Sequence, residues 1–146
     1  MSQGIKQIIE HLEAISFELV TMGYYVARGA KPLFIIGCFE FDSAEEMRGN
    51  KETVRTLIEG MGCSVDSDME ISSCAPIPCV IEGTNPDGKP VLHCAICSHK
   101  WVCEVYEWLC VGKVPTHLKD ALMGMLCGYD SISIEKFVET RVRNPK

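Results

Sequence analysis

Side chains that could bind a metal are concentrated between residues 74 and 99. Cys74 and Cys79 are separated by four residues, Cys94 and Cys97 by two, and His99 follows shortly afterwards. Thiolate and imidazole groups are the ligands that zinc prefers, and two cysteine pairs at the base of a hairpin are one way to build a zinc site. We therefore expect these five residues to converge and to hold one zinc ion.

The chain between the two cysteine pairs predicts a β-hairpin. Its centre, Asn85-Pro-Asp-Gly88, is a strong turn sequence between two apolar segments. If Thr84 pairs with Lys89, Cys79 lies directly opposite Cys94, and directly opposed residues have Cβ atoms about 4.5–5.5 Å apart. This register brings two sulfurs to a common ion, whereas a shift by one residue would separate them.

Two alternative functions use the segment Cys94-Ala-Ile-Cys97. A strand leads into a helix there, and a helix N-terminus stabilises a thiolate, so a redox-active thiol pair is one alternative. The other is a zinc enzyme. Zinc deaminases combine a His/Cys-x-Glu motif with Pro-Cys-x-x-Cys, and Cys38-Phe-Glu40 followed by Cys94-Ala-Ile-Cys97 is similar in part, although no proline precedes Cys94. A zinc- or thiol-dependent enzyme, deaminase-like or catalysing another metal-assisted hydrolysis, is therefore an alternative to a binding function.

The remaining cysteines fit a packing role. The chain has nine cysteines, and Cys38, Cys103, Cys110 and Cys127 lie in apolar segments. Free cysteine packs like a small apolar residue, so we assign these four to the core. Core and loop packing is also the alternative for the cysteines of the predicted zinc site. The N-terminal residues lack the basic start and apolar run of a signal peptide, so we expect a cytoplasmic protein with reduced thiols.

Three aromatic residues could form a ligand pocket. Trp101, Tyr106 and Trp108 lie on one predicted helix, and pockets are enriched in aromatic side chains. We predict that these residues bind a ligand, with core packing as the alternative.

Composition excludes several classes of protein. With 146 residues, 47% apolar and 23% charged, the chain is predicted to be one folded domain, residues 1–146. It has no apolar run near the roughly 20 residues that span a bilayer. The net charge of −6 arises in residues 1–73, with 6 basic and 12 acidic side chains. An acidic surface repels phosphate backbones, so we expect neither nucleic-acid nor membrane binding.

The hydrophobic pattern predicts an α+β fold. A small antiparallel sheet is expected to contain a central strand at about 33–41 and a hairpin at about 79–97, with three helices after it. A single N-terminal helix of more than twenty residues is predicted from apolar residues at alternating spacings of three and four: Ile5, Ile8, Leu12, Ile15, Leu19, Met22 and Val26. Ile9, Phe17 and Val20 widen this stripe beyond what a small sheet covers, so we also expect a homodimer.

No motif in the chain identifies a reaction. We therefore expect a small binding or regulatory protein, such as an accessory or inhibitor protein of a bacterium or mobile element. It would bind a small molecule or a protein partner in a groove between sheet and helices.

Overall fold

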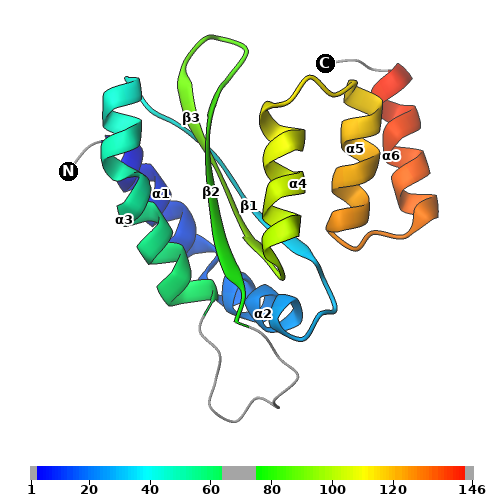
Figure 1. The fold of residues 1–146 in the computed structure, drawn as a ribbon, viewed down its shortest axis with the longest axis horizontal. Helices are drawn as coiled ribbons and strands as arrows, with labels where there is room; N and C mark the ends of the chain where they lie inside the picture. The colour runs from blue at the N-terminus through cyan, green and yellow to red at the C-terminus, as the bar shows by residue number, and fades with distance from the viewer. Residues whose placement is uncertain (1–2, 64–74, 144–146) are drawn as a thin grey trace.

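The computed structural model describes residues 3–63 and 75–143. Within these residues six helices surround a three-stranded antiparallel sheet, which confirms the predicted α+β class (Figure 1). The elements are α1 (Gln3–Ala14), α2 (Ser16–Ala27), β1 (Leu33–Glu40), α3 (Ala44–Gly62), β2 (Ile77–Thr84), β3 (Pro90–Cys97), α4 (Lys100–Val111), α5 (Thr116–Leu126) and α6 (Ser131–Arg143). None of the described helices has the length and apolar character needed to cross a bilayer.

Helices cover both faces of the sheet. α1, α2 and α3 pack on one face and α4 packs on the other, while α5 and α6 form a helical hairpin beyond α4 (Figure 1). The first face carries the larger core, which includes Leu12, Leu19 and Ile58. The second face carries a smaller core around Leu33, Ala95 and Tyr106. Each side of a strand therefore enters a separate apolar layer.

The strand order β1-β3-β2 corrects one prediction. The strand at 33–41 was expected to be central because its residues are apolar on both sides, but β1 is an edge strand and β3 is central. β1 is apolar on both sides because helices cover both faces of the sheet. It does not need a neighbouring strand on each edge to have this pattern. A bulge between Ile35 and Gly37 interrupts its pairing. The bulged carbonyl of Ile36 accepts a hydrogen bond from Nε2 of His11 at 3.0 Å.

The register of the hairpin differs from the prediction by one residue. Thr84 pairs with Pro90, not with Lys89, and Cys79 consequently pairs with Ala95. The side chain of Asn85 explains the difference, because its Oδ1 accepts hydrogen bonds from the backbone N–H groups of Asp87 (3.0 Å) and Lys89 (2.9 Å). These bonds hold Lys89 within the turn, and one extra turn residue shifts every pair in the ladder.

Most of the predicted N-terminal apolar stripe is buried, with Ile15 and Met22 half-buried, but its helix is not continuous. Ile5, Ile8, Leu12, Leu19 and Val26 are each at most 3% exposed. α1 and α2 are separate helices, divided at Ile15, whose φ of −106° and ψ of 16° depart from helical geometry.

This break lets α2 approach the end of α3 closely. Gly23 of α2 lies so near Gly62 that a Cβ on Gly23 would overlap the Gly62 carbonyl oxygen. The spacing of the apolar residues predicted one straight helix. A bend at a single residue leaves that spacing unchanged, so the break could not be predicted from it.

Candidate metal centre

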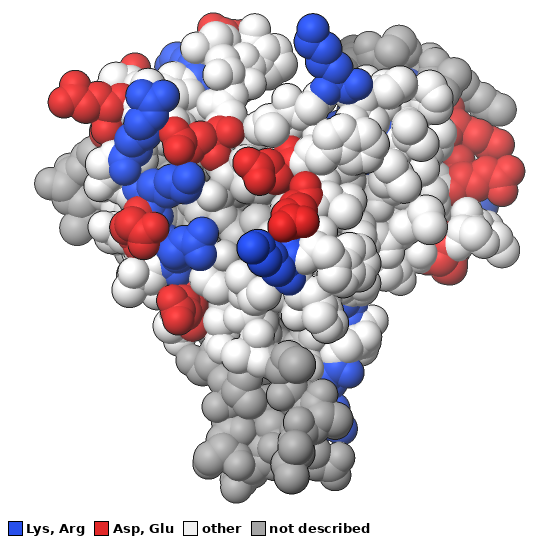
Figure 2. Space-filling model, viewed as in Figure 1, with Lys and Arg blue, Asp and Glu red and all other residues white. Residues whose placement is uncertain are grey.

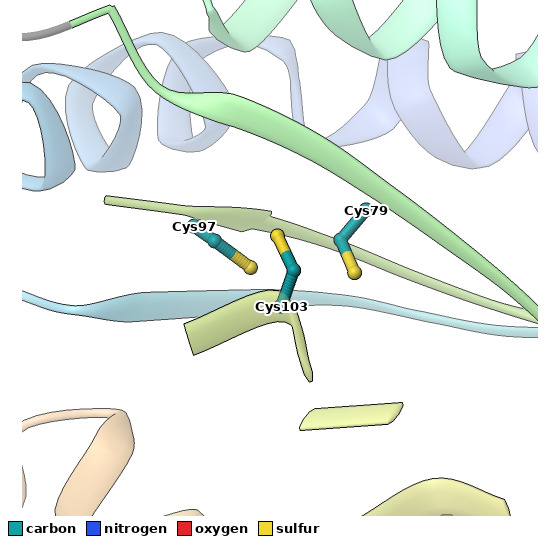
Figure 3. Close-up of side chains that lie close together, drawn as sticks. All are labelled: Cys79, Cys97 and Cys103. Atoms are coloured by element: carbon teal, nitrogen blue, oxygen red, sulfur yellow. The ribbon is translucent and has the colours of Figure 1, made fainter. Parts of the chain in front are cut away.

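Three cysteine side chains meet between the sheet and α4. The Sγ atoms of Cys79, Cys97 and Cys103 all lie within 4.8 Å of one another, and they come from β2, the end of β3 and the first turns of α4 (Figure 3). We call these three residues the thiol cluster. Cys97 is fully buried, Cys79 is 5% exposed and Cys103 is half-buried. The thiol cluster could hold a metal ion.

Strand geometry explains why Cys79 and Cys97 share one side of the sheet. Cys79 pairs with Ala95, and Cys97 lies two residues further along β3. Residues separated by two positions in a strand face the same side, so the two sulfurs are diagonal neighbours. The shifted register therefore replaces the expected partner of Cys79, Cys94, with Cys97.

The short connection after β3 supplies the third sulfur. α4 begins at Lys100, and the helix then runs back over the face that Cys97 occupies. Val102, Tyr106 and Leu109 of α4 are buried on its inner side. Cys103 lies beside Val102 on that side, and its sulfur projects between those of Cys79 and Cys97 (Figure 3).

The structure separates the other predicted ligands from this cluster. Cys94 pairs with Val80 and is buried in the core beneath α1–α3, on the opposite face of the sheet. His99 is exposed at the start of α4, with its Nδ1 atom 3.0 Å from the Ser98 hydroxyl. Cys74 lies outside the described residues. Of the five predicted ligands, the described residues bring together only Cys79 and Cys97.

Cys103 was assigned to core packing from the sequence. It belongs to the inner side of α4 together with Val102 and Tyr106, and that position could have been read from helical spacing. Its proximity to Cys79, however, depends on the hairpin register and on the direction of α4. Neither of these is visible in the spacing of the cysteines.

The contacts within the thiol cluster favour ionisation of Cys103 over that of its two neighbours. Hydrogen bonds from the Cys79 and Cys97 thiols hold the pKa of Cys103 well below its ordinary value, and the positive charge of Arg55 contributes. The same interactions with Cys103 raise the pKa of Cys97 and raise that of Cys79 to about 12. Arg55 is anchored next to the cluster because its Nη1 donates to the Pro78 carbonyl at 3.2 Å.

The deaminase-like arrangement is not formed. Cys38 is exposed and pairs with His93, four residues before Cys97 on β3. Cys94 faces the other layer of the protein. Cys38, Cys94 and Cys97 therefore do not surround a common point in the described part of the chain, and an enzyme function stays a prediction.

The three aromatic residues of α4 predicted to bind a ligand differ in exposure. Tyr106 is 1% exposed and packs against the sheet, apart from the two exposed tryptophans, so ligand binding by these three residues stays a prediction. Trp101 and Trp108 are 56% and 50% exposed and lie seven residues apart, on the outer side of α4. An open groove occurs elsewhere, between α5 and α6, where Met125, Tyr129 and Ile134 are among its lining residues.

Charged side chains of both signs are mixed on the face shown in Figure 2. Glu82 of β2 accepts hydrogen bonds from Arg48 at 3.0 Å and Lys51 at 3.2 Å, both on α3. The single carboxylate of Glu82 therefore offsets only part of the positive charge of these two residues. Basic side chains adjoin one another on this face, with acidic side chains among them (Figure 2).

Comparisons of the chain with protein-family models, curated proteins and solved structures find no match. The functional argument therefore depends on the chemistry of the thiol cluster and its surroundings. Three closely spaced sulfur atoms are ligands for soft or borderline metal ions such as zinc and monovalent copper.

Proposed function

We propose that this chain is a small cytoplasmic binding or regulatory protein, and that its thiol cluster binds one zinc ion. The observation that carries the proposal is the convergence of three sulfur atoms from two strands and a helix within 4.8 Å. Cys79, Cys97 and Cys103 would be the zinc ligands. They provide three of the four positions that zinc usually fills, which leaves one position for a water molecule or another donor.

The charge balance supports zinc over monovalent copper. Three thiolates around a divalent ion leave one net negative charge, and around a monovalent ion they leave two. Burial makes uncompensated charge costly, and Cys97 is fully buried. Arg55, whose positive charge already acts on Cys103 and which also lies 3.7 Å from Glu52, would offset part of the single charge left by zinc.

Bound zinc would act as a structural clamp. β2 and β3 are joined to each other by the hairpin, and α4 follows β3 through a short connection and packs on the sheet. A zinc ion on Cys79, Cys97 and Cys103 would connect all three elements. Because the ligands come together only in the folded chain, the free energy of zinc binding adds to the free energy of folding.

The clamp would also hold the outer side of α4 in place. Trp101 and Trp108 are half exposed there and could contact a small ligand or a protein partner. Trp101 is two residues from Cys103, so the orientation of this surface would depend on the metal. We infer that metal binding and partner binding are linked through α4.

Metal content and cobalt spectroscopy test the proposal. The full chain, expressed with added zinc, is expected to contain one zinc ion per chain by elemental analysis. Replacing zinc by Co²⁺ should produce sulfur-to-cobalt charge-transfer absorption and should quench the emission of nearby Trp101. Cys103→Ala should lose most of the bound metal and the absorption.

Cys110→Ala is the matched control, because Cys110 is half-buried on the same helix seven residues later and lies outside the thiol cluster. It should retain zinc at the wild-type level. Equal metal content in the two variants, or a metal-free wild type after loading with zinc, would show that the cluster is thiol packing alone.

A further inference from the structure

The outer side of α2 carries an apolar stripe that nothing in the described chain covers. Phe17, Val20 and Tyr24 are 86%, 60% and 47% exposed. Their spacing of three and four residues places them along one side of the helix. Single exposed apolar residues are common, but a continuous row of this kind marks a contact surface.

The inner side of the same helix is fully engaged. Leu19 and Val26 are buried in the main core, and Gly23 lies against the end of α3. α2 therefore cannot rotate to bury Phe17 without exposing these residues. Within the described part of the chain, the outer stripe therefore stays uncovered while the fold is intact.

One acidic and one basic residue lie at opposite ends of α2. Glu18 lies in the first turn of α2, and Arg28 follows its last residue. Among the described residues neither forms an ion pair within the chain. The Arg28 guanidinium lies over the Tyr24 ring, 5.3 Å from its centroid, and its Nη1 donates to the Tyr24 hydroxyl at 3.0 Å.

This arrangement is complementary to itself. When two copies of α2 pack side by side in opposite directions, the Glu18 end of each helix meets the Arg28 end of the other. Parallel packing would instead bring Glu18 against Glu18 and Arg28 against Arg28. A two-fold symmetric contact uses the same patch on both copies, and the α2 stripe has the charge order that such a contact needs.

We propose that two copies of this chain associate through the outer sides of their α2 helices, arranged antiparallel about a two-fold axis. The net charge of −6 arises in residues 1–73, which include α2, so contact through this part of the chain needs a local attraction. On the α2 stripe, apolar contact is combined with opposite charges. α2 lies on the face of the sheet away from the thiol cluster, so this proposal is independent of metal binding.

Sedimentation velocity of the full chain over about a hundredfold concentration range tests the association. We expect a reversible monomer–dimer equilibrium, because a contact centred on one three-turn helix is at the small end of specific interfaces. Phe17→Ser and Val20→Ser should each shift the protein to the monomer. Both side chains are exposed, so circular dichroism should show an unchanged fold for at least one of the two variants.

Ile132→Ser and Phe137→Ser are the matched controls, because these residues are 65% and 53% exposed on α6. They should leave the association unchanged. A wild type that is monomeric at all concentrations would overturn the proposal. So would dissociation caused by the α6 variants but not by the α2 variants.

A charge exchange tests the antiparallel arrangement. Glu18→Arg and Arg28→Glu should each weaken the dimer by about tenfold, because every ion pair occurs twice in a two-fold symmetric contact. The double variant should recover most of the wild-type affinity. Failure of the double variant to recover, with both single variants weakened, would exclude this arrangement.

Discussion

Cys94 and Cys97 lie three residues apart on β3, yet their side chains enter opposite layers of the protein. An odd separation along a strand always has this result, because successive side chains alternate between the two faces. A Cys-x-x-Cys segment chelates one ion only where the chain between the cysteines turns. Here the strand continues through Cys97, so Cys97 acts with Cys79 and Cys103 instead of with Cys94.

This separation predicts different responses to chelation. In zinc-loaded protein, a strong chelator should lower the melting temperature of the wild type and of Cys94→Ala by similar amounts. The melting temperature of Cys97→Ala should not respond, because that variant lacks a ligand and gains no stability from the metal. Differential scanning fluorimetry with and without chelator measures the three shifts. A chelator response in Cys97→Ala equal to that of the wild type would contradict the assignment of this ligand.

Two buried thiols predict a loss of stability at alkaline pH. Burial raises the pKa of Cys63 and of Cys94 to about 12 each, from an ordinary value of 9.0. Between these values the unfolded chain releases thiol protons that the folded chain keeps, so the free energy of unfolding decreases as pH rises. The stabilisation is complete below about pH 9 and is lost progressively toward pH 12.

Urea unfolding of metal-free protein at several pH values between 8 and 11 checks this dependence. The midpoint should be nearly constant at the lower pH values and should fall above about pH 9. Cys63→Ala and Cys94→Ala should each make the fall less steep, because each removes one thiol that resists ionisation. An equally steep fall in both variants would assign the alkaline loss to other groups.

The apolar stripe of the N-terminal segment was predictable because burial follows spacing. Leu12 and Leu19 belong to one helical side whether the helix is straight or bent, so the pattern indicated the buried residues correctly. The break at Ile15 has no signal of this kind. It accompanies the packing of Gly23 against Gly62, two residues about forty positions apart, and a local pattern does not contain that contact.

The candidate site was predictable only in part, because it depends on a register. Turn residues indicated the hairpin, but hydrogen bonds from Asp87 and Lys89 to the Asn85 side chain set the number of residues in the turn. Because the turn contains one residue more than predicted, Cys97, and not Cys94, is the neighbour of Cys79. Cys103 joins the thiol cluster because α4 runs back over the sheet, and the spacing of the cysteines does not indicate that direction.

The different burial of side chains along α1 and α2 predicts unequal losses of stability when they are replaced by alanine. Leu12 is 1% exposed in the main core, so Leu12→Ala should lower the free energy of unfolding by about 2–5 kcal/mol. Ile15 is only partly buried at the break, so Ile15→Ala should cost less. Phe17→Ala, at an 86% exposed position, should change the stability of the monomer by less than about 0.5 kcal/mol. Denaturant titration in dilute solution measures all three, and equal losses for Leu12 and Phe17 would contradict the burial pattern.

The close approach of α2 and α3 makes opposite predictions for two helical glycines. A Cβ on Gly23 would overlap the backbone carbonyl of Gly62, and backbone atoms cannot move aside as the end of a side chain can. Gly23→Ala should therefore destabilise the protein by about 1–3 kcal/mol. Gly49 lies within α3, where a Cβ would meet no atom within 4 Å. Gly49→Ala should stabilise the protein by up to about 1 kcal/mol, because alanine is the better helix former. Urea midpoints of the two variants measure this difference, and a neutral Gly23→Ala would show that α2 and α3 do not need this contact.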